Sequence, residues 1–193
     1  MKISLGARTL VYPTPVFCVG TYDAEGKPNA MAVAWGGVCC SKPPCVAISL
    51  RKATYTYGSL VESKAFTVSV PSRDHVVAAD YFGIASGRDV DKFAAAGLTP
   101  ARSDLVDAPY VAEFPLVLEC KVVHVAELGL HTLFVGEILD VKIEEDCLDA
   151  EGKPSADLVR PFTWAPGDNL YYALGEKLGR GFTVGKALQE EKE

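Results

Sequence analysis

The stretch richest in polar side chains between predicted regular elements is residues 49–57, Ser-Leu-Arg-Lys-Ala-Thr-Tyr-Thr-Tyr. The run follows an apolar, strand-like segment, and Thr54 stands where a helix is predicted to begin. Hydroxyl groups, the cations Arg51 and Lys52, and free backbone amides at a helix amino terminus are the groups that bind a phosphate monoester. A capped helix beside a solvated basic turn explains the same residues, so composition alone leaves both interpretations open.

A second unusual pattern lies at residues 29–35, Asn-Ala-Met-Ala-Val-Ala-Trp, where small side chains alternate with large ones between Asn29 and Trp35. Small residues on one face of a strand let a flat ring approach the backbone. Core packing gives the same pattern and is the favoured interpretation when the pattern is taken alone. Lys92 and His131 are single polar residues in apolar surroundings, and each, taken alone, is predicted to be a surface contact.

The six cysteines include a cluster at positions 39, 40 and 45. The cluster lacks a C-x-x-C pair and a second half, so no iron–sulfur or zinc site is predicted. Buried thiols flanking a turn are the expected arrangement.

No catalytic side chain can be assigned from residue types and spacing. The sequence contains no recognisable Ser/His/Asp or Cys/His arrangement and no glycosidase-like carboxylate pair, and its three histidines are scattered. If the protein is an enzyme, a cofactor is expected to supply the reactivity.

Charge and composition exclude several classes of partner. The 193 residues carry a net charge of -6, with 49% apolar and 23% charged residues. An acidic chain without Lys/Arg clusters is unsuited to nucleic acid or to anionic membranes. No segment has the roughly 18 consecutive apolar residues of a membrane span, and residues 1–15 lack a signal-peptide core. A cytoplasmic protein with reduced cysteines is expected.

The hydrophobic pattern predicts a mainly β fold with appended helices, a small barrel of antiparallel strands, because strands outnumber helices and follow one another directly. One domain is expected over residues 1–193, with a core at about 10–165 and an extension at 166–193 whose charged end, 189–193, frays. Asp74 and Thr54 are predicted helix caps. The predicted strands are 16–22, 29–35, 45–51, 65–70, 116–123 and 131–143, and the predicted helices are 55–63 and 74–82.

Several ordered motifs resemble one known family. Residues 47–57 resemble a pattern in which a strand ending in serine is followed by Asn-Pro-x-Arg/Ser-x-Thr at a flavin phosphate. Phe-Thr-Val-Ser-Val-Pro at 66–71 and the stretch from Gly83 through Asp-Lys-Phe at 91–93 to Gly97-Leu98 continue the pattern in the same order. The family is the flavin reductase-like, FMN-binding split barrel. Residues 12–16, 35–37 and 81–87 are most similar to its flavoredoxin branch, and the likeness spans about 10–164.

The resemblance implies an FMN-binding split β-barrel that is typically a homodimer with flavin near the interface. It implies that Lys92 adds a positive charge near the phosphate. Arg51-Lys52 replaces the usual Asn-Pro, and Ser69 replaces a common asparagine. The first change adds charge at the phosphate and favours tightly held FMN. The implied cofactor-binding residues are Ser49, Arg51, Thr54, Thr56 and Lys92 for the phosphate and ribityl chain, Asn29, Ala32 and Trp35 for the isoalloxazine, and His131 and Trp164 near the ring.

The function implied by the resemblance is electron transfer by bound flavin between protein partners. An NAD(P)H-dependent flavin reductase that releases reduced flavin is the alternative, and a non-catalytic flavin-binding module is a second alternative. In each case the protein binds and orients the flavin, which supplies the redox chemistry.

Overall fold

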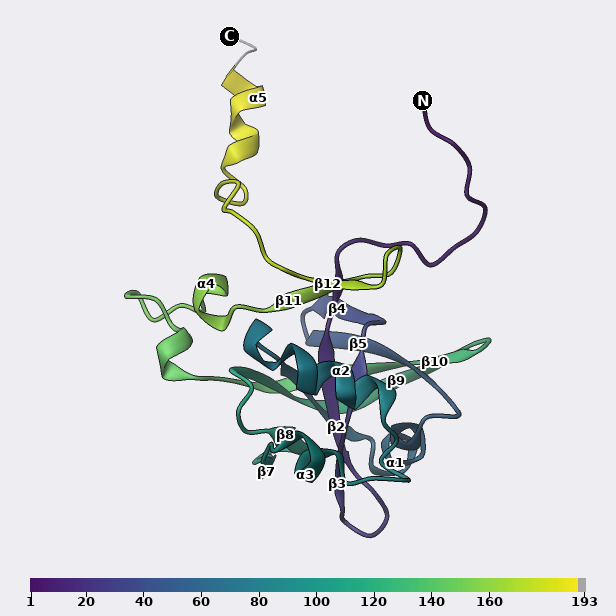
Figure 1. Cartoon of the computed structure of the whole chain (residues 1–193). Coiled ribbons are helices and arrows are strands. Elements are labelled where there is room, and N and C mark those ends of the chain that lie inside the picture. Colours follow the sequence, from purple (N-terminus) through teal and green to yellow (C-terminus); the bar gives the residue numbers. More distant parts are fainter. Residues whose placement is uncertain (191–193) are drawn as a thin grey trace.

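A computed structural model describes residues 1–190 of the chain. Its centre is a seven-stranded antiparallel sheet in the order β3-β2-β6-β9-β10-β5-β4, with short helices around it (Figure 1). The strands of this sheet are β2 (Phe17–Tyr22), β3 (Pro28–Val33), β4 (Gly36–Ser41), β5 (Pro44–Arg51), β6 (Ala65–Val70), β9 (Leu116–Leu128) and β10 (His131–Ile143). The mainly β, antiparallel split-barrel prediction is confirmed.

Two smaller sheets and short helices surround this sheet. β1 (Thr14–Pro15), β11 (Phe162–Ala165) and β12 (Leu170–Ala173) form one small sheet, and β7 (Pro100–Arg102) and β8 (Pro109–Val111) form the other. The α-helices are α1 (Tyr55–Ser63), α2 (Val76–Ile84), α3 (Lys92–Ala96), α4 (Ala156–Val159) and α5 (Ala187–Glu190), and the 3₁₀ turns are η1 (Arg73–His75), η2 (Glu145–Cys147) and η3 (Val184–Lys186).

The long β9–β10 hairpin forms as the alternating pattern predicts. His131 opposes Leu128, and Gly129 takes a positive φ of 64° in the turn, a conformation that favours glycine. Two register shifts interrupt the ladder, between Val135 and Gly136 and between Ile138 and Asp140. Bulges of this kind bend strands, and they help the sheet to curl into a barrel.

Two hydrophobic clusters show how the sheet curls. The first joins Val19 of β2 to Ile48 of β5 and Phe134 of β10, so strands from both ends of the sheet share one interior. The second lies on the other side of β2, where Cys18 packs with Phe82 of α2. β2 is therefore buried on both faces, which explains its nearly continuous apolar sequence.

Several local predictions were wrong or incomplete. Asp74 does not cap a helix, because the chain forms the 3₁₀ turn η1 there and Asp74 instead forms an ion pair with Arg160. Cys39 and Cys40 are exposed, and only Cys45 of that cluster is buried. Cys39 and Cys40 lie on β4, which the residue pattern does not predict because Gly36-Gly37 favours a turn.

The chain before β1 and the described chain after β12 extend from the same side of the body (Figure 1). β12, inside the predicted extension, pairs with β11, and α5 ends the described chain. The prediction that 189–193 fray concerns residues partly outside the described range, which ends at 190. No helix within residues 1–190 is long and apolar enough to cross a membrane.

Candidate functional site

A groove of about 360 Å³ brings together residues from five separate parts of the chain. The ends of β3 and β5, the start of β10, the last turn of α2 and the β11–β12 hairpin all contribute to its wall. Seven of the ten predicted site residues line it: Ala32, Trp35, Ser49, Arg51, Thr54, His131 and Trp164.

Aromatic rings form one wall of the groove. The rings of Trp35 and His131 are nearly parallel, with an interplanar angle of 5° and centroids 6.1 Å apart. Trp164 lies 5.7 Å from Trp35 at an angle of 37°, and its indole N–H donates to Asn169 Oδ1 at 2.9 Å. His131 is therefore not an isolated surface contact. Planar surfaces of this kind suit stacking against a flat heteroaromatic ring.

The β-sheet sets the position of this wall. The Ser49 backbone N–H donates to the Trp35 carbonyl oxygen at 2.8 Å, which fixes the turn between β3 and β4 against β5. His131 opposes Arg51 in the β10–β5 ladder, so both side chains are anchored at the same end of the sheet. The sheet therefore holds Trp35, Ser49, Arg51 and His131 in place.

The small residues of β3 divide between two roles. Ala30 is completely buried in the second hydrophobic cluster, as the core-packing interpretation predicts. Ala32 and Ala34 line the groove. A Cβ added at Gly83 of α2 would lie 3.3 Å from the Ala32 Cβ, so helix and strand are closely packed behind the groove.

A second compartment of about 270 Å³ adjoins the groove, and Met31, Thr54, Gly83 and Ile84 line both. Thr54 occupies the N-cap position of α1 but makes no side-chain cap, because its hydroxyl donates to the Arg51 carbonyl oxygen at 2.8 Å. The amino end of α1 therefore opens toward this compartment without a side-chain cap. The remaining predicted residues that line it are Thr56 and Lys92.

Asn29 does not line either compartment and lies apart from the aromatic wall. Its side chain is 4% exposed, and its amide donates to Thr56 Oγ1 at 2.9 Å. Its Oδ1 has no partner among the described residues and lies beneath Gly87. The structure thus places Asn29 behind the second compartment, where it orients Thr56.

The Gly87 backbone fits over Asn29 with no room for a side chain. A Cβ at this position would collide with Asn29 Oδ1 and lie 2.8 Å from Tyr55 Cδ1. We expect Gly87→Ala to lower the free energy of unfolding by about 1–3 kcal/mol, the usual cost of overpacking, and to weaken ligand binding in the second compartment. Gly58→Ala is the matched control, because nothing lies within 4 Å of its added Cβ and alanine is the better helix former. Denaturant unfolding of both variants measures the difference, and equal stabilities would contradict the packing argument.

Lys92 is buried, with 4% of its surface exposed, and its Nζ donates to the Phe82 carbonyl oxygen at 3.0 Å. The surface position expected from its sequence neighbours was therefore wrong. Burial lowers the pKa of Lys92 to about 8, and the nearby Cys18 opposes this shift weakly. Among residues 1–190 Lys92 has no carboxylate partner, and it lines the second compartment together with Thr54 and Thr56. A buried cation with hydroxyl groups in the same compartment is suited to an anionic ligand.

The lowered pKa of Lys92 makes stability depend on pH in a defined direction. Below about pH 8 both the folded and the unfolded chain hold the proton, so the full cost of the buried charge is present. Between about 8 and 10.5 the folded chain releases the proton first, so the cost declines as pH rises. We expect ligand-free Lys92→Met to be more stable than wild type at pH 7, by up to about 3 kcal/mol, with the difference shrinking toward pH 10.5. Urea unfolding across this range measures it, and a constant difference would contradict the assignment.

Residue types and spacing did not reveal three further contributors to the groove. Asp80 of α2 accepts a hydrogen bond from the Tyr171 hydroxyl at 2.7 Å, which links α2 to β12 across the groove. Burial, followed by this hydrogen bond, raises the pKa of Tyr171. Arg88 lines the second compartment and stacks over the Tyr55 ring at 5.9 Å. No local motif links residues so far apart in the chain.

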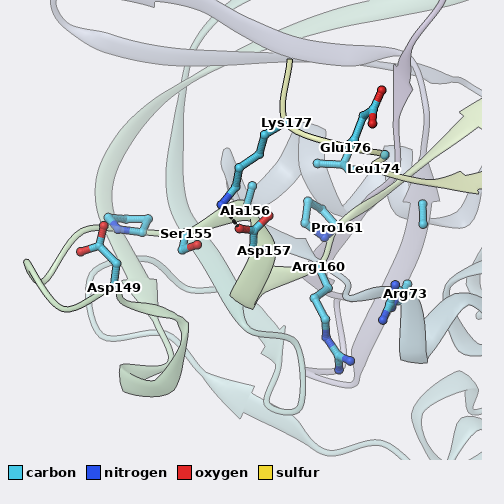
Figure 2. Close-up of a pocket in the computed structure, with 13 residues that line it drawn as sticks. Arg73, Asp149, Ser155, Ala156, Asp157, Arg160, Pro161, Leu174, Glu176 and Lys177 are labelled. Carbon is cyan, nitrogen blue, oxygen red and sulfur yellow. Dashed lines mark ion pairs between the residues drawn. The ribbon is translucent and has the colours of Figure 1, made fainter. Parts of the chain in front are cut away.

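A larger cavity of about 650 Å³ lies elsewhere, between α4 and the segment after β12 (Figure 2). Lys177 is paired with Asp157 there, as Figure 2 shows, and Arg160 is paired with Asp74. None of the predicted site residues lines this cavity, and it lacks an aromatic wall. Its size alone does not make it the functional site.

Comparison with known proteins establishes the class. The model of the family described as "Flavin reductase like domain" matches residues 8–172. The chain belongs to this family of flavin-binding proteins.

Solved structures agree with this assignment. The chain is 57% identical to flavoredoxin of Desulfovibrio vulgaris (Miyazaki F), over 96% of this chain and 100% of that one, with a TM-score of 0.92. It is 32% identical to flavoredoxin from Methanosarcina acetivorans, over 97% and 99%, with a TM-score of 0.90. It is 25% identical to an FMN-binding protein from Thermus thermophilus, over 93% and 97%, with a TM-score of 0.78. The predicted resemblance to flavoredoxins is confirmed.

Proposed function

We propose that the protein is an FMN-binding flavoprotein that transfers electrons. The observation that carries the proposal is two adjoining compartments, one with an aromatic wall and the other with a buried cation, Lys92, that has no carboxylate partner among residues 1–190. A flavin mononucleotide has this division, a flat ring joined by a polar chain to a phosphate. The similarity to an FMN-binding protein and to two flavoredoxins supports the choice of flavin.

Each end of the groove has a distinct role in holding FMN. Trp35, His131 and Trp164 would border the isoalloxazine ring and exclude water from it, with Ala32 on the floor. Lys92 and Arg51 would neutralise the phosphate, and charge-assisted contacts are the strong kind of hydrogen bond. Ser49, Thr54 and Thr56 offer hydroxyls to the ribityl chain and phosphate, and Asn29 keeps Thr56 oriented. Bound flavin supplies reversible transfer of electrons, and no side chain is assigned as a general acid or base.

We infer that a redox protein donates or accepts the electrons. The 57% identity to a flavoredoxin favours this role, and Trp35 is 40% exposed at the rim of the groove, so a partner could approach the ring edge. The family description, flavin reductase-like, keeps an NAD(P)H-dependent reductase as the second candidate. A non-catalytic flavin-binding role is the third.

Anaerobic mixing experiments separate these roles. NADH or NADPH is added to the flavin-loaded protein, and the visible flavin absorption is followed over time. We expect the absorption to persist with nicotinamide and to bleach with a reduced ferredoxin- or rubredoxin-type protein. Rapid bleaching by NADH or NADPH would establish the reductase role instead, and persistence with every donor would favour the non-catalytic role.

We further propose that the chain forms a homodimer in the cytoplasm. Apolar side chains are exposed around the tip of the β9–β10 hairpin, at Val123, Val125, Leu128 and Leu130. Clusters of exposed apolar side chains are typical of protein–protein interfaces. Free thiols suit a reducing compartment. Sedimentation of the full chain tests the assembly: we expect a dimer, and Val125→Asp with Leu128→Asp should shift it toward monomer. A wild-type monomer at all concentrations would contradict the proposal.

A further inference from the structure

The β4–β5 hairpin carries three cysteines in an uneven arrangement. Val38 opposes Val46, and the next pair is Cys40 opposite Cys45. Cys39 therefore lies between two pairs on β4 with no counterpart on β5, which makes it the extra residue of a β-bulge. In a regular ladder Cys39 would oppose Cys45. The bulge instead selects Cys40 as the partner.

The Cys40–Cys45 pairing has the backbone geometry of a disulfide. Directly opposed residues in an antiparallel ladder have Cα atoms about 4.5–5.5 Å apart. A disulfide joins Cα atoms about 4.4–6.8 Å apart. Both residues are free thiols in this structure. A bond between them therefore requires side-chain rotation and no rearrangement of the strands.

The two thiols differ in their access to solvent. Cys40 is exposed, whereas Cys45 is 4% exposed. Burial raises the pKa of Cys45, and the neighbouring Cys40 and Cys39 thiols raise it further. An external disulfide can thus reach Cys40 but not Cys45. An exposed thiol paired with a buried one is typical of an attacking and a resolving thiol.

We propose that Cys40 and Cys45 form a reversible dithiol–disulfide site that exchanges electrons with external disulfides. The Cys40 thiolate attacks one sulfur of a small disulfide and releases one thiolate, which leaves a mixed disulfide on Cys40. Cys45 loses its proton to solvent and attacks the Cys40 sulfur, which expels the second thiolate. One external disulfide is reduced to two thiols, and the two protein thiols are oxidised to one disulfide.

This site is separate from the flavin groove. None of the three cysteines lines either compartment of the groove. The hairpin nevertheless connects the two sites, because Trp35 immediately precedes β4 and Ser49 lies on β5. Oxidation would therefore crosslink the turn end of a hairpin whose other end holds residues of the groove.

Oxidised glutathione added anaerobically to the full, reduced chain tests the proposal. Intact-protein mass spectrometry should show the loss of two hydrogen atoms. Free thiols are then alkylated with one reagent, and thiols recovered by reduction are alkylated with a second. We expect the second label on Cys40 and Cys45 and the first label on Cys39. A mass that shows only added glutathione would overturn the proposal.

Cysteine variants distinguish a Cys40–Cys45 disulfide from a Cys39–Cys45 disulfide. Cys39→Ser should retain the intramolecular disulfide, whereas exposed Cys40→Ser should lose it and leave at most glutathione adducts. Cys45→Ala, checked for folding by circular dichroism, should stop at the mixed disulfide on Cys40. Loss of the disulfide in Cys39→Ser together with its survival in Cys40→Ser would show that Cys39 is the true partner. Flavin content, measured in the same samples, does not enter this test, so the two proposals fail independently.

Discussion

Replacing Lys92 with methionine is expected to weaken FMN binding by roughly 10–150-fold, because a hydrogen bond to a charged group contributes about 1.5–3 kcal/mol. The same change should leave the flavin-free protein as stable as wild type or more stable at pH 7. The loss of FMN affinity and the unchanged or higher stability have the same cause. Burial makes the uncompensated charge costly in the empty groove, and a phosphate dianion would remove that cost. Fluorescence titration with FMN measures the affinity.

Exposed Lys121→Met is the matched control, since it removes a lysine on β9 that lines neither compartment. It should change neither affinity nor stability by more than a few tenths of a kcal/mol. Unchanged FMN affinity in Lys92→Met would show that Lys92 does not contact the phosphate. Parallel loss of affinity and stability would show that Lys92 supports the fold and has no direct role in binding.

Trp35→Ala is expected to weaken FMN binding by roughly 5–150-fold, because stacking of a flat base on an aromatic side chain contributes about 1–3 kcal/mol. Trp35 is 40% exposed, so little stability should be lost with its ring. Trp35→Phe retains an aromatic face and should recover most of the affinity. Phe182→Ala, in the exposed segment before η3, is the control outside the groove. Affinity that falls equally in Trp35→Ala and Trp35→Phe would contradict a stacking role.

Local patterns were sufficient to predict much of the fold. The β9–β10 hairpin was predictable because alternating side chains and one glycine turn lie within a single continuous stretch. The polar run at 49–57 was also predictable, because the end of β5 and the start of α1 are adjacent in the chain. These features depend on neighbours in sequence and need no tertiary information.

Tertiary packing determines the side-chain positions that local sequence patterns did not predict. Lys92 is buried because α3 packs against α2, where the Phe82 carbonyl oxygen accepts a hydrogen bond from its Nζ. Cys39 and Cys40 are exposed because they lie on β4, an edge strand of the sheet. The bulge in this strand is not predictable from the residue pattern. Trp164 joins the groove from β11, far along the chain from Trp35. Predicting these positions required the pairing of distant strands.

The proposed function depends most directly on whether the groove holds FMN. The decisive measurement is the visible absorption spectrum of the purified wild-type chain, followed by titration of the flavin-free chain with FMN and chromatography of any flavin released by heat. We expect flavin bands, saturation at one FMN per chain, and FMN as the released flavin. A colourless protein that also leaves added FMN unbound would contradict the proposed function.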